Sequence, residues 1–129
     1  MMTKYGFFSA VCAREGDGSP GQKVDSEKVM VRARDAAHLE NLMDAFSNWL
    51  HAHTIYESDD SDYPCRIFMQ KSIWQCIVSD IIKGMDYDNF KSEVHRSELT
   101  NPRYGDALMS TWGTMHRVTP PSDSDRQLT

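Results

Sequence analysis

Residues 65–85 read Cys-Arg-Ile-Phe-Met-Gln-Lys-Ser-Ile-Trp-Gln-Cys-Ile-Val-Ser-Asp-Ile-Ile-Lys-Gly-Met, and this stretch decides the fold class. Its first six residues predict a strand that presents Cys65, Ile67 and Met69 on one face and Arg66 and Phe68 on the other. The residues that follow predict an amphipathic helix, which a capping box of Ser72 and Gln75 opens. The apolar stripe of that helix is Trp74, Ile77, Val78, Ile81, Ile82 and Met85. A strand that leads directly into a helix indicates a mixed α and β domain.

The same strand-then-helix pattern occurs earlier in the chain. Residues 28–34 alternate, and the face that we expect to be buried holds Val29, Val31 and Ala33. Asp35 is expected to cap the helix that follows. The apolar stripe of this helix consists of Leu39, Leu42, Met43, Phe46 and Leu50.

Each of these two strands has a predicted partner immediately before it. Residues 5–13 are rich in aromatic and β-prone side chains, and the glycine-rich loop 16–22 joins them to the next strand. Residues 54–57 predict a short strand that the acidic turn 58–62 follows. The order ββαββα therefore predicts an α+β domain: a four-stranded antiparallel sheet with both long helices on one face, which is a permuted ferredoxin-like arrangement.

Two short helices are expected after this unit. Asp86 or Asp88 is expected to cap the first of them, and Asn101-Pro102 has the form of a helix start for the second. Their apolar residues are Phe90 and Val94 in the first, and Tyr104, Leu108, Trp112 and Met115 in the second. We expect one domain over residues 1–118 and a disordered tail over residues 119–129, because the tail is polar and contains two prolines.

The composition excludes several classes of protein. The net charge of −5 argues against a general binder of nucleic acid or anionic membranes, because such proteins need a basic surplus. The three cysteines form no Cys-x-x-Cys pair, so we expect free thiols, no metal and no cofactor. No apolar run has the length of a signal peptide or of a bilayer-spanning helix, so we expect a cytoplasmic protein with no membrane partner.

The most polar candidate site follows the second long helix and contains Tyr87, Asp88, Asn89, Lys91 and Glu93. As a functional site, Asp88 or Glu93 would accept protons and Lys91 would hold an anion. The alternative is a capping turn, in which the polar side chains satisfy the free N–H groups of a helix and the aromatic rings anchor the turn. A divalent-cation site built from Asp86, Asp88 and Glu93 is a third alternative, although their spacing matches no EF-hand loop.

Basic residues form a second candidate site, on the sheet face that points away from the helices. Arg32, Arg34 and Arg66 share this face with Phe68, and Phe8 is expected there as well. RNA-recognition domains bind bases on such a face with arginine and aromatic side chains. The acidic net charge argues against RNA here, so the alternative is that this face meets the terminal helices or a second subunit through salt bridges.

The histidines give a weaker signal. His51 and His53 have the His-x-His spacing of half a zinc site, beside an acidic turn that contains Asp59, Asp60 and Asp62. Because no third ligand follows at a recognisable spacing, we expect an exposed hairpin turn rather than a metal site. His38 is expected at the edge of the core, beside the apolar stripe of the first long helix.

Several segments resemble known sequences. These are residues 29–34 with His38-Leu39, residues 62–67, Trp74, residues 87–94, Tyr104 with Ala107-Leu108, and Trp112-x-x-Met115. In these segments the chain is similar to a group of short bacterial and phage-type proteins with no established activity. The motif Tyr-Asp-Asn-Phe-Lys-Ser-Glu-Val at residues 87–94 is the most specific part of the resemblance, which covers roughly residues 5–117. The longer glycine-rich loop and the Pro-Pro tail depart from the pattern of that group.

We therefore expect a non-enzymatic module that binds another protein. A small acidic protein of phage or mobile-element type suits the inhibition of a host defence or regulatory protein, since an acidic surface complements a partner that normally binds nucleic acid. We also expect a homodimer, formed through the sheet edge or the open face. The alternatives are a small enzyme or small-molecule binder that uses residues 87–93 together with Arg66, and RNA binding on the open sheet face.

Overall fold

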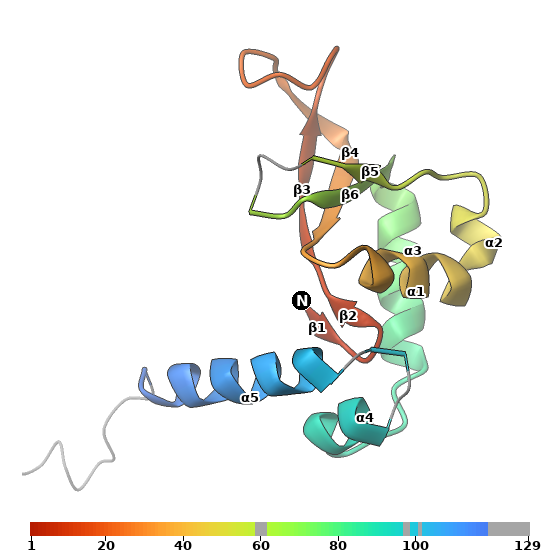
Figure 1. Cartoon of the computed structure of the whole chain (residues 1–129). Coiled ribbons are helices and arrows are strands. Elements are labelled where there is room, and N and C mark those ends of the chain that lie inside the picture. The colour runs from red at the N-terminus through yellow and green to blue at the C-terminus, as the bar shows by residue number, and fades with distance from the viewer. Residues whose placement is uncertain (59–61, 97–98, 101, 119–129) are drawn as a thin grey trace, which may run out of the picture.

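The computed structural model describes residues 1–58, 62–96, 99–100 and 102–118 of the 129-residue chain. At its centre lies a four-stranded antiparallel sheet in the order β3-β4-β6-β5 (Figure 1). The strands are β3 (Ser9–Arg14), β4 (Val24–Ala33), β5 (Tyr56–Glu57) and β6 (Cys65–Gln70). The predicted mixed α+β class and the antiparallel four-stranded sheet are confirmed.

One face of the sheet packs against three helices, which are α1 (Ala36–Ala45), α2 (Ser47–Leu50) and α3 (Lys71–Lys83). The residues of this core are Phe8, Val29, Val31, Ala33, Leu39, Leu42, Phe46, Leu50, Cys65, Ile67, Met69 and Ile77. The predicted inner faces of the two central strands are therefore correct. Asp35 also caps α1 as predicted, because its Oδ1 accepts a hydrogen bond from Ala37 N at 2.9 Å.

The first long helix is interrupted, which the sequence pattern does not reveal. Phe46 leaves the helical conformation at φ −121° and ψ 41°, between the end of α1 and the start of α2. Its ring packs edge-on against Tyr5, with the ring centroids 5.5 Å apart. The bend lets Phe46 and Leu50 both reach the core, where their exposed fractions are 9% and 0%.

Helix α3 departs from prediction at both ends. It begins at Lys71 with Gln70 as the N-cap residue, and no side chain bonds the cap, so the predicted box of Ser72 and Gln75 is wrong. The reason is that β6 runs directly into the helix, one residue before Ser72. At the other end, Ile82 is 62% exposed because the last turn of α3 extends past the core.

The N-terminal strand is divided in two. Met2–Thr3 (β1) and Gly6–Phe7 (β2) form a separate small hairpin, and only then does β3 join the main sheet. The register pairs Ser9 with Arg32, so Phe8 points to the opposite face and is fully buried in the core. The expectation that Phe8 lies on the open face is therefore wrong.

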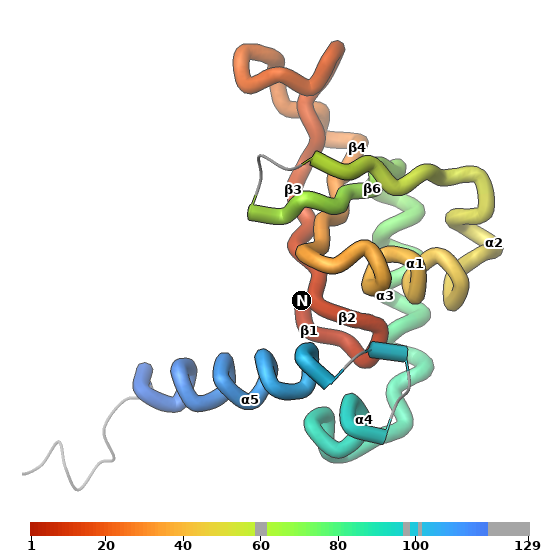
Figure 2. The backbone as a smooth tube through the Cα atoms, in the orientation of Figure 1, coloured from red at the N-terminus to blue at the C-terminus, as the bar shows by residue number. Residues whose placement is uncertain are grey.

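Two C-terminal helices, α4 (Phe90–Arg96) and α5 (Pro102–His116), lie at the β1–β2 end of the molecule (Figure 2). They form a second apolar cluster of Val94, Tyr104 and Leu108, against which Phe7 and Phe90 pack. The far half of α5 projects away from the body, so Trp112 and Met115 are exposed rather than part of a buried stripe. These helices leave the outer face of the sheet open. Asn101 and residues 119–129, on which two predictions rest, lie outside the described residues.

None of the helices in the described ranges combines the length and the apolar character that crossing a bilayer requires.

Candidate functional site

The outer face of the sheet carries positive charge and apolar side chains together. The strand register places on this face Ser9, Val11, Lys28, Met30, Arg32, Tyr56, Arg66, Phe68 and Gln70. None of these side chains is a carboxylate, although the whole chain has a net charge of −5. We call this set of side chains the basic face. This face thus carries three cations, Lys28, Arg32 and Arg66, and no carboxylate in strand register, on a protein whose net charge is negative.

Arg32 and Arg66 stand directly opposite each other on the two central strands. Arg32 donates a hydrogen bond to Ser9 Oγ at 2.8 Å, and Arg66 donates to the Tyr63 carbonyl at 3.4 Å. The Nε atoms of both arginines are buried and have no hydrogen-bond partner among the described residues. Like charges in directly opposed positions repel, so an anion bound between them would be stabilised by both.

Aromatic rings hold the cations of this surface in place. The Arg32 and Arg34 guanidinium carbons lie 4.7 and 5.8 Å from the centre of the Tyr63 ring. Lys28 Nζ lies 5.5 Å from the centre of the Phe68 ring, against which Tyr56 packs edge-on. These cation–π contacts orient the charges with little conformational freedom left to lose on binding. Arg34 follows the last residue of β4 and lies at the border of the basic face.

The basic face is hollowed beside Phe68. Two cavities of about 420 and 380 Å³ share Phe68 in their walls, and both are also lined by Asp17 and Gly18 of the glycine-rich loop. The hairpin register shifts between Cys12 and Ala13, shortly before this loop. Gly18 has a φ of +78°, a conformation that glycine adopts at low cost. The loop thus forms a wall of the face, a role that its composition alone does not indicate.

The polar cluster after α3 is built as a helix cap. Asn89 Oδ1 accepts a hydrogen bond from Ser92 N at 3.0 Å, and the Asn89 carbonyl accepts one from Glu93 N at 3.1 Å. Asn89 therefore caps α4, in place of the predicted Asp86 or Asp88. These contacts favour the capping alternative over a catalytic cluster.

The other members of this cluster have partners of their own. Glu93 is 8% exposed, forms an ion pair with Arg96, and lies 4.0 Å from Lys4 Nζ. Lys91 Nζ lies 3.7 Å above the centre of the Trp112 ring on α5. The rings of Tyr87 and Phe90 pack against each other at 6.3 Å, while Asp88 is exposed. The cluster therefore joins α4 to the N-terminus and to α5.

The candidate residues fall into two separate groups. Arg32, Arg34 and Arg66 lie on or beside the sheet, whereas residues 87–93 lie at α4, below the β1–β2 hairpin in Figure 1. No described cavity of the chain is lined by both groups. Arg66 and residues 87–93 therefore lie apart in the described structure.

Asparagine 89 is expected to contribute to stability rather than to binding. Asn89→Ala removes the cap of α4 and should lower the stability of that helix by about 1 kcal/mol. Faster amide hydrogen exchange in residues 90–96 would show the loss. Asn89→Asp retains a capping oxygen and should exchange at the parental rate. An unchanged rate of amide hydrogen exchange in Asn89→Ala would contradict the role of Asn89 as the cap of α4.

The His-x-His pair does not build a metal site with described residues. His51 Nδ1 lies 3.2 Å from the Ser47 carbonyl of its own helix, which occupies one of its ring nitrogens. His53 Nδ1 is buried without a hydrogen-bond partner among the described residues. Asp59 and Asp60 lie outside the described residues, and among the residues that the structure describes no three metal-ligating side chains are grouped.

A buried histidine lies where the small hairpin meets α1. His38 is 7% exposed, as expected for the edge of the core, and its Nδ1 accepts a hydrogen bond from Phe7 N at 3.3 Å. The Tyr104 ring lies 4.8 Å from the His38 ring, and the Tyr104 hydroxyl donates to the Thr3 carbonyl at 2.7 Å. Burial lowers the pKa of His38, against a smaller opposing effect of the Asp35 carboxylate. Burial also raises the pKa of Tyr104. Both groups are therefore neutral at neutral pH.

The lowered pKa of His38 makes folding stability depend on pH. The folded state binds this proton less readily than the unfolded chain, so the contribution is complete above the unfolded pKa of about 6.5 and is lost as pH falls toward the folded pKa. We expect the unfolding free energy to fall between pH 7.5 and 5.5, and to fall less in His38→Asn, which keeps an acceptor for Phe7 N. Urea titrations of both proteins at the two pH values measure the difference. An equal fall in unfolding free energy in the two proteins would show that His38 does not cause the pH dependence.

Comparisons with known proteins give no family assignment. The chain matches no protein-family model, and no curated protein or solved structure is significantly similar to it. The function must therefore be argued from the residues of the chain alone.

Proposed function

We propose that this protein is a non-enzymatic binding module, and that its basic face binds an acidic segment of another protein. The observation that supports this most is the pair of opposed arginines, Arg32 and Arg66, set among apolar side chains on an open surface that carries no carboxylate in strand register. Within the described residues neither arginine lies within salt-bridge distance of an acidic group. A partner's carboxylates would supply the missing counter-charges, and apolar residues between them would enter the hollows beside Phe68.

The arrangement of the sheet supports the same proposal. The strand order β3-β4-β6-β5 with its helices on one side fits a permuted ferredoxin-like sheet, and we propose that arrangement for the chain. The open face of such a sheet is a usual binding surface. The resemblance to phage-type proteins fits inhibition of a host defence or regulatory protein in the cytoplasm. A second copy of this acidic chain is also a suitable acidic partner, so homodimerisation is one outcome that the experiments must separate.

Single-stranded RNA is the second candidate, because arginine and aromatic side chains occur together on the face. Base stacking needs an open ring face, and here Tyr63 and Phe68 each already carry a cation of the protein on one side. The acidic net charge of the chain also weakens attraction to phosphates at long range. An acidic protein segment therefore suits the face better.

The enzyme alternative has less support. Residues 87–93 serve as a cap and as ion-pair and ring contacts between elements, and Arg66 does not join them. A small-molecule site that combines these groups would need a cavity lined by both, and neither the two cavities beside Phe68 nor the one along α5 is so lined.

Binding of two defined polyanions tests the proposal. Fluorescein-labelled peptides of alternating glutamate and phenylalanine, and a labelled oligouridylate, would be titrated with the protein by fluorescence anisotropy at 50 and 200 mM salt. We expect the peptide to bind and the oligonucleotide to bind much more weakly. The double variant Arg32→Gln with Arg66→Gln should lose about tenfold or more in peptide affinity, because it removes two charge-assisted contacts.

The matched control removes the same charge from the other side of the molecule. Lys71→Gln with Lys83→Gln lies at the two ends of α3, on the helical side of the sheet, and should leave peptide affinity unchanged. Tighter binding of the oligonucleotide, with loss in the arginine variant, would favour RNA instead. Equal affinity of the two double variants for the peptide would contradict a role for the basic face. Sedimentation of the free protein separates homodimerisation from these outcomes.

A further inference from the structure

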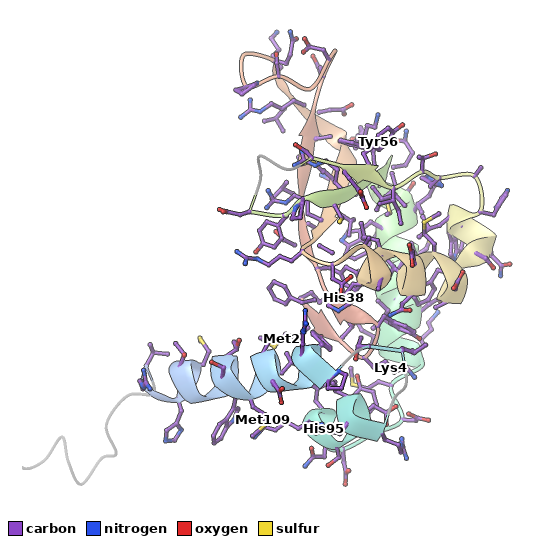
Figure 3. All side chains as sticks on the ribbon, in the orientation of Figure 1. Met2, Lys4, His38, Tyr56, His95 and Met109 are labelled. Carbon is purple, nitrogen blue, oxygen red and sulfur yellow. The ribbon has the colours of Figure 1, made fainter. Side chains whose placement is uncertain are left out.

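A third cavity lies away from the basic face, in the angle between α5 and the β1–β2 hairpin. Its volume is about 430 Å³, which is in the range of small-molecule sites. The apolar residues that line it are Met2, Phe7, Ala107 and Leu108. Figure 3 shows Met2 beside α5 and His38 farther up, at α1. We call this cavity the α5 groove.

The polar groups that line the α5 groove are mainly donors and cations. Arg34 and Arg103 are exposed and line it, and neither lies within salt-bridge distance of an acidic residue in the described part of the chain. The carboxylate in its lining is Asp35, whose Oδ1 is engaged as the cap of α1. Two cations thus face one carboxylate that already has a structural role.

The imidazole of His38 adds a further donor. Its Nδ1 accepts the Phe7 N–H, so the neutral ring carries its proton on Nε2. No hydrogen bond of Nε2 to another described residue is formed. The hydroxyl of Tyr104, by contrast, is already used in its bond to Thr3. Donors without acceptors in an apolar groove are suited to a ligand that brings acceptor oxygens.

We propose that the α5 groove binds a small molecule with an apolar body and a single carboxylate, such as a medium-chain fatty acid. The apolar body would lie along Phe7, Ala107 and Leu108, and the carboxylate would be held by Arg34 and Arg103 at the mouth. None of the side chains of the basic face lines this groove, although Arg34 borders both. Helix α5 supplies one wall of the groove and the β1–β2 hairpin supplies another.

Competition between paired ligands tests the site. The fluorescent probe is 1-anilinonaphthalene-8-sulfonate, which has an apolar body and one anionic group, and its neutral counterpart is N-phenyl-1-naphthylamine. We expect the anionic probe to bind the folded protein, decanoate to displace it, and decanol to displace it about tenfold less well, because decanol lacks the charge-assisted contacts. Equal displacement by decanoate and decanol would overturn the anionic part of the proposal.

Three variants locate the binding. Arg103→Gln should weaken decanoate binding about tenfold and leave decanol binding unchanged. Ala107→Trp fills the groove and should abolish binding of both, whereas Ser110→Trp, at another exposed position of the same helix, should bind like the parent. Circular dichroism of each variant shows that it is folded. Undiminished decanoate binding by Ala107→Trp would place the ligand elsewhere and overturn the proposal. Binding to vesicles of anionic lipid, with no displacement of the probe by free decanoate, would also overturn it.

Discussion

Replacing Gly6 with alanine should lower the free energy of unfolding by about 2–5 kcal/mol, through backbone strain and overpacking together. Gly6 has a φ of +151°, which L residues rarely adopt. A methyl group at this position would also overlap the Cβ and Cγ atoms of His38 and lie 2.7 Å from its Nδ1. The change would push His38 away from Phe7 N and open the contact between the small hairpin and α1. Urea unfolding followed by circular dichroism measures the loss.

The control for this variant is Gly113→Ala in α5. An added methyl group at Gly113 meets no atom within 4 Å, and alanine favours a helix over glycine by about 1 kcal/mol. We therefore expect Gly113→Ala to be neutral or slightly stabilising. Similar stabilities for the two alanine variants would show that His38 does not lie as close to Gly6 as the structure places it.

Truncation of the two phenylalanines on opposite faces of the sheet should lower the free energy of unfolding by very different amounts. Phe8 is fully buried in the core, so Phe8→Ala should cost about 3–5 kcal/mol through lost burial and the cavity left behind. Phe68 lies on the basic face beside two hollows, so Phe68→Ala should cost about 1 kcal/mol and should instead weaken binding of the acidic peptide. Denaturation curves and peptide titrations of both variants provide the comparison. An equally large stability loss in Phe68→Ala would mean that this face is covered in the native protein.

Alternation and helical spacing predicted the parts of the fold that depend on local pattern. Residues 65–70 form β6 as predicted, and Val29, Val31 and Ile67 are buried on the face that the pattern assigns. The sequence pattern puts Phe8 on the wrong face because the orientation of Phe8 depends on how β3 pairs with β4. The residues next to Phe8 in the sequence do not determine that pairing. The interruption at Phe46 was missed for a similar reason, since a helix bends there to satisfy tertiary contacts.

The candidate site also has parts that local sequence pattern predicts and parts that it does not. That Arg32, Arg66 and Phe68 share one face follows from strand alternation and pairing, and the register agrees. Whether that face binds a partner stays a prediction. The role of residues 87–93 could not be read from composition, because the same side chains build a cap or a catalytic cluster, and only the bond from Ser92 N to Asn89 distinguishes them. The α5 groove joins residues about 100 positions apart in the chain, so no local pattern could indicate it.

Affinity capture from lysate of the cells in which the protein occurs tests the basic face most directly. The tagged parent, the double variant Arg32→Gln with Arg66→Gln, and the control Lys71→Gln with Lys83→Gln would be compared by mass spectrometry, each with and without nuclease. We predict that the parent and the lysine control recover the same stoichiometric protein, that nuclease does not release it, and that the arginine variant fails to recover it. Recovery of that protein by all three would contradict a binding role for the basic face, and release by nuclease would contradict direct recognition of a protein.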